Sequence, residues 1–71
     1  MNETILIVEV DPLMEQHLSL LLQQQGYRIA GVAVSAESAL AQAAQARPDL
    51  IIMDSLLEDG VDGIEAAQRI N

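Results

Sequence analysis

Two short apolar runs, each followed by an acidic residue, constrain the fold of this chain most strongly. Residues 5–8 (ILIV) precede Glu9, and residues 50–53 (LIIM) precede Asp54. Short continuous apolar runs that contain β-branched side chains are typical of strands buried on both faces of a parallel sheet. We therefore predict a parallel sheet with an acid at the carboxyl end of two of its strands.

A helix is predicted between the first run and the next strand, over residues 13–25. Asp11 suits the N-cap and Pro12 the first helical position, while Gly26 suits the position just after the helix. The apolar residues that recur at helical spacing, and so mark one packing face, are Met14, Leu18, Leu21 and Leu22.

The same alternation continues through the rest of the chain. Residues 28–34 are a second strand candidate, and Ser35 can cap a second helix that runs to about residue 46. The predicted packing face of that helix consists of Ala39, Leu40, Ala43 and Ala44. Residues 64–71 are expected to begin a third helix. The order β-α-β-α-β-α predicts an α/β fold with right-handed crossovers.

Length, charge and composition exclude several classes of protein. The 71 residues allow one small domain at most, and the net charge of −8 with three basic residues argues against nucleic-acid binding. The absence of cysteine excludes disulfides and cysteine-based zinc sites. No apolar run approaches the roughly 20 residues that span a bilayer, and the N-terminus lacks a signal sequence. We expect a soluble, cytoplasmic chain without a membrane partner.

The acids at the ends of the predicted strands are the candidate functional residues. Ligands of open parallel sheets bind beyond the carboxyl ends of the strands, where Glu9, Asp11 and Asp54 would meet. Clustered carboxylates repel one another unless a cation or protons neutralise them. Since Mg²⁺ prefers oxygen ligands, this arrangement suggests a small hard-cation site, beside which an aspartate can attack a phosphoryl group.

Several segments together resemble the response-regulator receiver domains of two-component signalling. They are residues 5–13 (ILIVEVDPL), 26–27 (GY), 38–40 (SAL), 47–54 (RPDLIIMD) and 62–66 (DGIEA). The resemblance covers essentially the whole chain, and the order and spacing of the segments make it specific. It implies a flavodoxin-like, doubly wound parallel sheet of five strands in the order 2-1-3-4-5. Residues 1–71 would then be a truncated receiver domain with strand order 2-1-3, its fourth and fifth strands missing.

The resemblance also implies a site. Asp54 matches the aspartate that accepts a phosphoryl group from a sensor histidine kinase. In the family, two acids after the first strand bind Mg²⁺ with that aspartate, and the backbone carbonyl two residues after it, here that of Leu56, is a further ligand. The metal ligands expected in this chain are accordingly Glu9, Asp54 and the Leu56 carbonyl, with Asp11 as an additional candidate.

This sequence departs from the family pattern at two points. Val10 occupies the position of the second acid, which is the direct metal ligand, so that Glu9 is left to act and Asp11 comes one position late and also suits a helix cap. The chain contains no lysine, although the family uses one to bind the phosphoryl group. These departures leave open a second hypothesis, a non-phosphorylatable fragment that acts only through protein–protein association.

Further predictions concern the third strand, enzyme activity, His17 and the acidic loop. An open, apolar edge at the third strand would favour dimerisation, domain swapping, pairing with a missing segment, or poor folding. We expect no enzyme. A third hypothesis, an aspartate-nucleophile phosphatase, is disfavoured, because those enzymes have a second aspartate where this chain has Leu56. His17 is expected to be a surface or half-buried helix residue. The acids at positions 58, 59 and 62 are expected to form a solvated turn.

Overall fold

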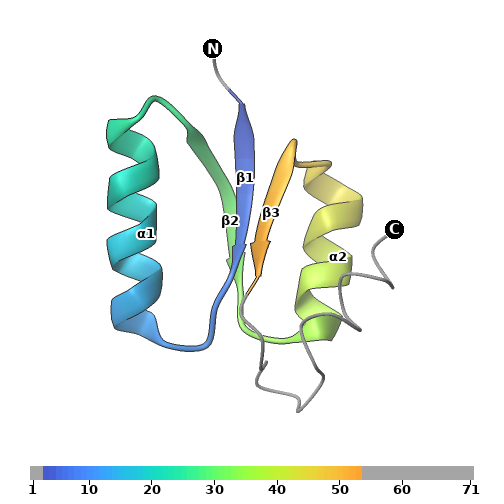
Figure 1. Ribbon diagram of the computed structural model, residues 1–71. Coiled ribbons are helices and arrows are strands. Elements are labelled where there is room, and N and C mark those ends of the chain that lie inside the picture. The colour runs from blue at the N-terminus through green and yellow to red at the C-terminus, as the bar shows by residue number, and fades with distance from the viewer. Residues whose placement is uncertain (1–2, 54–71) are drawn as a thin grey trace.

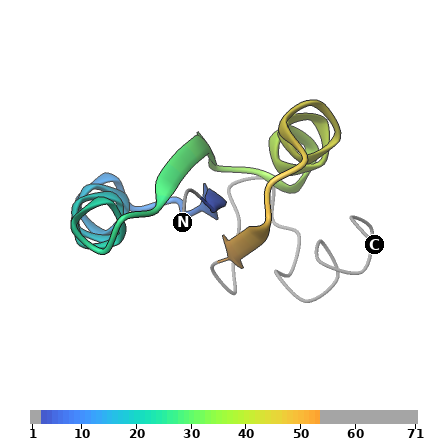
Figure 2. The ribbon, with the colours of Figure 1, turned by 90° about the horizontal axis from the view of Figure 1, so that it is seen from above.

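In the computed structural model, which describes residues 3–53, a parallel sheet lies between two helices (Figure 1). The elements in chain order are β1 (Thr4–Val8), α1 (Pro12–Gln24), β2 (Arg28–Ala33), α2 (Ala36–Ala46) and β3 (Leu50–Met53). The strand order is β2-β1-β3, so β1 occupies the centre. Seen along the strands, α1 and α2 lie on opposite faces of the sheet (Figure 2). The predicted α/β class, parallel pairing and order 2-1-3 are confirmed.

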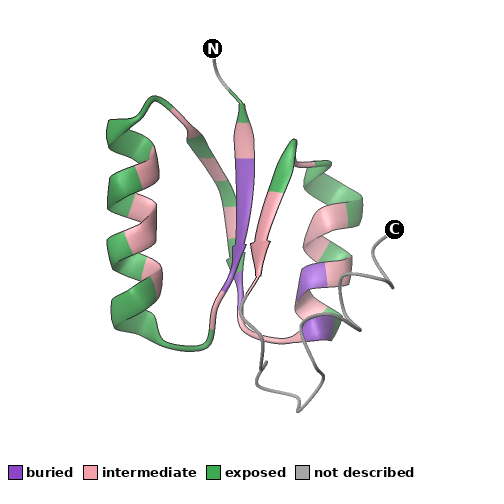
Figure 3. Cartoon of the chain, in the orientation of Figure 1, coloured by how far each residue is buried: buried purple, intermediate pink, exposed green. Residues whose placement is uncertain are grey.

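The central strand is buried on both faces, as its sequence predicts. Residues 5–8 are each at most 1% exposed (Figure 3). On one face, Leu6 and Val8 pack with Ala33 of β2 and with Ala36 and Ala39 of α2. Because side chains alternate along a strand, the other two apolar residues of β1 point to the face that carries α1.

Each helix begins at the predicted cap. The Asp11 carboxylate accepts a hydrogen bond from the Leu13 N–H at 3.0 Å, and Pro12 is the first residue of α1. The Ser35 hydroxyl accepts from the Ser38 N–H at 3.1 Å at the start of α2. These bonds satisfy backbone donors that have no partner inside the helix.

The ends of the helices follow different rules. At the end of α1, Gly26 has φ 94°, and the Tyr27 N–H donates to the Leu22 carbonyl while the Gly26 N–H donates to Gln23. This is the pattern that places glycine after a helix. At the end of α2, Arg47 takes the left-handed conformation with φ 47°, and Pro48 follows it. The predicted end of this helix at about residue 46 is confirmed.

A contact at the amino end of the sheet joins residues far apart in sequence. The Thr4 N–H donates to the Asp49 carboxylate at 2.8 Å, and the Asp49 N–H donates to the Thr4 carbonyl at 2.9 Å. These bonds tie the beginning of β1 to the turn that precedes β3.

Several predicted details differ from the structure. The first helix spans residues 12–24 rather than 13–25, and β2 ends at Ala33 rather than at residue 34. Met14 and Leu21 are exposed, because α1 lies along β2 and no described element covers its outer side. On α2 the predicted contacts of Ala39 and Ala43 are confirmed, whereas Ala44 is exposed and Ala36 is buried in its place.

The third strand is less buried than its apolar sequence suggests. Leu50 is 55% exposed, and the other residues of β3 are half-buried. Among the described residues, β3 pairs with β1 alone, so one of its edges has no strand beside it there. The third helix predicted over residues 64–71 lies outside the described residues.

Candidate functional site at the carboxyl end of the sheet

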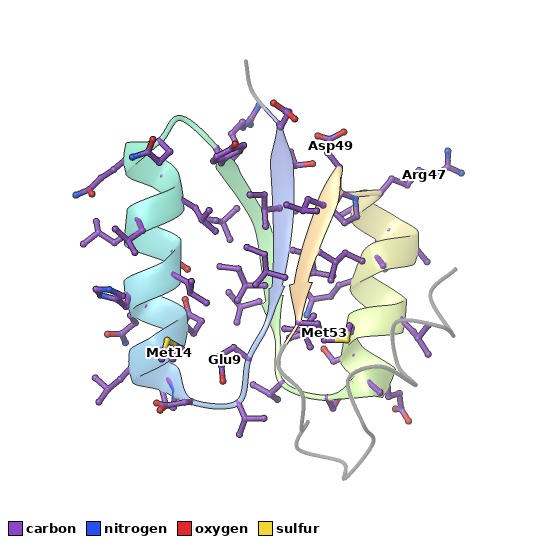
Figure 4. All side chains as sticks on the ribbon, viewed as in Figure 1. Glu9, Met14, Arg47, Asp49 and Met53 are labelled. Carbon is purple, nitrogen blue, oxygen red and sulfur yellow. The ribbon has the colours of Figure 1, made fainter. Side chains whose placement is uncertain are left out.

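The candidate site begins where β1 and β3 end side by side. Val8 of β1 is the register partner of Met53 of β3, and both strands run in the same direction. The next residue after Val8 is Glu9, and the next after Met53 is Asp54. Figure 4 shows Glu9 and Met53 at this end of the sheet and Asp49 at the opposite end. Asp54 and Leu56, predicted as phospho-acceptor and carbonyl ligand, lie outside the described residues.

Glu9 is held at the edge of the sheet by its own backbone. Its N–H donates to the Ala33 carbonyl of β2 at 2.9 Å, which extends the pairing of β1 and β2 by one residue. Its side chain is half-buried, and one carboxylate oxygen accepts from the Asp11 N–H at 3.2 Å. The other carboxylate oxygen accepts no hydrogen bond from residues 3–53.

Asp11 serves the helix more directly than the site. Its Oδ1 accepts from the Leu13 N–H, and its backbone carbonyl accepts from the Glu15 N–H at 3.0 Å. The two-residue step from Asp11 to Leu13 is the usual way in which an aspartate closes a turn onto its own backbone. The predicted role of Asp11 as a helix cap is confirmed, and its role as a ligand stays a prediction.

Val10 projects from the loop between β1 and α1. Its side chain is 38% exposed and offers no atom that can bind a metal. Within residues 3–53 no group of three or more histidine, cysteine, aspartate or glutamate side chains gathers closely enough to hold a metal ion. Of the predicted metal ligands, Glu9 and Asp11 lie within the described residues, and Asp54 and Leu56 lie beyond Met53.

The sequence did not predict the hydrogen bond between the Glu9 carboxylate and the Asp11 N–H. The only signal for this bond in the sequence is that Glu9 and Asp11 are separated by a single residue. This bond fixes the direction of Glu9 relative to the start of α1, so the two acids form one connected turn. His17 is exposed on α1, as expected.

Comparison with known proteins identifies the family. The model of the response regulator receiver domain matches residues 5–71. The chain belongs to this family. Two curated relatives agree with the assignment, and this receiver chain spans less than a third of the length of either.

The first of these relatives is the transcriptional regulatory protein AfsQ1 of Streptomyces coelicolor, 40% identical over 67 residues, which cover 94% of this chain and 29% of the relative. The second is protein-glutamate methylesterase/protein-glutamine glutaminase 1 of Syntrophus aciditrophicus. It is 43% identical over 67 residues, which cover 93% of this chain and 19% of the relative.

A solved structure supports the fold directly. The receiver domain of the response regulator PhyR from Erythrobacter litoralis superposes with a TM-score of 0.92 at 35% identity, over 97% of this chain and 54% of that one. The doubly wound receiver fold predicted from the sequence is thereby confirmed. In the described residues, neither helix of this receiver chain has the length and apolarity that crossing a bilayer demands.

Proposed function

We propose that this chain is the phospho-accepting module of a two-component phosphorelay, with Asp54 as the acceptor and a sensor histidine kinase as the donor. The observation that carries the proposal is the pairing of Val8 with Met53 in a chain that belongs to the receiver family. This pairing ends the two strands together immediately before Glu9 and Asp54. The module would lie in the cytoplasm and would not itself be an enzyme.

The reaction is a transfer between two side chains. An oxygen of the Asp54 carboxylate attacks the phosphorus of a phosphohistidine, a P–O bond forms and the P–N bond breaks. The electron pair of that bond stays on the imidazole nitrogen, which takes up a proton. The product is an acyl phosphate, which adds negative charge and strong acceptors at one end of the sheet.

A magnesium ion would assist the transfer. Its ligands would be the carboxylates of Glu9 and Asp54 and the backbone carbonyl of Leu56, with Asp11 as a further candidate. The ion would neutralise negative charge on the phosphoryl oxygens. Glu9 fits this role because one of its carboxylate oxygens receives no hydrogen bond from residues 3–53, whereas Asp11 is engaged at the start of α1. Val10 removes one direct ligand, so we expect weak binding.

Intact-mass spectrometry after incubation with acetyl phosphate and Mg²⁺ tests the proposal. We expect a single phosphoryl adduct that hydroxylamine removes, and no adduct on Asp54→Ala. Val10→Asp restores the second acid and should accelerate formation of the adduct. Val10→Asn is the matched control, because it has a similar shape and provides an oxygen without the negative charge.

A second function, protein–protein association without phosphorylation, is favoured by Val10 and by the exposure of β3. If Val10 prevents phosphorylation, the chain acts through protein–protein association alone, and the half-exposed third strand, with Leu50 at 55% exposure, is the surface that would self-associate. Absence of the adduct on a folded wild-type chain, together with its appearance on Val10→Asp, would establish this alternative. Absence on both proteins would contradict the assignment of Asp54.

A further inference from the structure

The second strand forms the other edge of the described sheet. Among residues 3–53, β2 pairs only with β1, and the Ala33 carbonyl accepts from the Glu9 N–H at 2.9 Å. Consecutive residues of a strand turn their backbone groups to opposite sides, so the carbonyl of Val32 points away from β1. An outward carbonyl on an edge strand is the group to which an additional strand would bind.

The side chain of Gln42 occupies that position. Its Nε2 donates to the Val32 carbonyl at 3.0 Å and to the Ser38 hydroxyl at 3.0 Å. A primary amide nitrogen has two N–H groups, and both are used here. Ser38 lies one turn earlier on α2, and its own N–H donates to the Ser35 hydroxyl. The amide is thus held in place by the first turns of α2.

Gly31 provides the space for this amide. A Cβ atom added to Gly31 would collide with Oε1 of Gln42 and would also approach Cδ1 of Leu6 at 3.6 Å. Glycine within a strand often marks the close approach of another group. The glycine at this position, which has a low strand propensity, is therefore explained by the contact with α2.

The strand is also irregular beside this contact. Ile5 pairs with Ile29 and the next residue, Leu6, pairs with Gly31, so Ala30 is passed over in the register. Such a bulge disrupts the regular row of donors and acceptors that a second strand would need. The bulge and the Gln42 amide therefore affect the same short stretch of edge.

We propose that Gln42 protects the edge of β2 against pairing with β2 of a second copy of this chain. The amide satisfies the outward carbonyl of Val32, to which a second strand would otherwise bind. This protection is independent of phosphorylation and leaves the edge of β3 as the described edge without such a side-chain cap.

The test is the self-association of the whole 71-residue chain, measured by sedimentation equilibrium over a range of concentrations. Gln42→Leu keeps a side chain of similar size but removes the N–H groups that donate to the Val32 carbonyl. That outward carbonyl then becomes available to a second strand. Because pairing of β2 with β2 of a second copy is symmetric, one carbonyl becomes available on each copy. The gain of about two net hydrogen bonds implies that dimers form at about ten- to a hundredfold lower concentration than in the wild type. Circular dichroism would verify that the variant is folded.

Two further variants distinguish pairing at the edge of β2 from nonspecific hydrophobic association. Gln45→Leu makes the same substitution at an exposed position of α2 and should associate like the wild type. Val32→Pro, added to Gln42→Leu, removes an outward N–H of β2 and should abolish the additional dimers. If proline lowers the melting temperature, Val32→Lys takes its place, because lysine on an edge strand also opposes pairing.

Three results would contradict the protective role of Gln42, and one would support it. Unchanged association of folded Gln42→Leu, equal association of Gln45→Leu, or dimers that persist with both edge-blocking substitutions would each overturn the proposal. Increased association that is specific to Gln42→Leu and is suppressed at Val32 would establish it.

Discussion

The two helices cover opposite faces of one sheet, but they do so in different ways. In α2, Ala36 and Ala39 are fully buried, and the helix contacts both β1 and β2. In α1 no residue is fully buried, although the helix is longer and richer in leucine. Figure 3 shows the contrast directly, with buried residues on α2 and none on α1.

This contrast shows that close packing of a helix on this sheet depends on small side chains rather than on hydrophobicity. Alanine lets the backbone of α2 approach the sheet, so that Leu6 and Val8 fill the space between. The larger residues of α1 lie half outside the contact, and Leu20 is 58% exposed. We therefore expect substitutions on the α2 face to cost more free energy of unfolding than comparable substitutions on the α1 face.

The largest effect should come from shortening the side chains of β1. Leu6 and Ile7 are equally buried but belong to opposite faces. Each substitution by alanine should lower the free energy of unfolding by about 2–5 kcal/mol, depending on how far the surroundings can collapse. Leu6→Ala should cost more than Ile7→Ala, because α2 is held close by its alanines and cannot move in further. Urea denaturation measures both values, and the reverse order would refute the contrast between the faces.

Enlarging a residue of the α2 contact should have the next largest effect. Ala39→Leu forces additional volume between α2 and the sheet and should destabilise the chain by about 1–3 kcal/mol. Ala41→Leu on the exposed side of the same helix should change stability by less than about 0.5 kcal/mol. Equal effects in thermal denaturation would show that the α2 face is less tightly packed than we conclude.

The helix caps should produce the smallest effects, and these should be similar for both helices. Asp11→Ala and Ser35→Ala each remove the side-chain acceptor of one N–H and should each cost about 1 kcal/mol. Asp11→Asn retains an acceptor and should remain close to the wild type. A much larger loss for Asp11→Ala than for Ser35→Ala in urea denaturation would indicate that Asp11 does more than begin a helix.

Most of the fold could be predicted because local signals agree with it. The apolar runs, the caps at Asp11 and Ser35 and the glycine after α1 each act within a few residues, and they identified every described element. The exposure of Met14, Leu21 and Leu50 could not be predicted in this way. Helical spacing shows which residues share a face, but only the arrangement of the strands shows whether that face is covered.

The candidate site was predictable only in part, for a related reason. The adjacency of β1 and β3 follows from the strand order, and it places Val8 beside Met53 as expected. The direction of the Glu9 carboxylate depends on a hydrogen bond from the Asp11 N–H, which no sequence motif predicts. The contact between Gln42 and Gly31 was missed as well, because it joins a helix to a strand through two residues of low apolarity.

The link between Thr4 and Asp49 has a kinetic consequence. It joins residues that are 45 positions apart. β3 can pair with β1 only after the chain between the two strands has folded back to bring them together. Contacts of such long sequence separation must overcome the entropy of loop closure before they contribute, and they slow folding. The Thr4 amide proton should therefore be protected from exchange late in refolding, at the moment when the third strand docks.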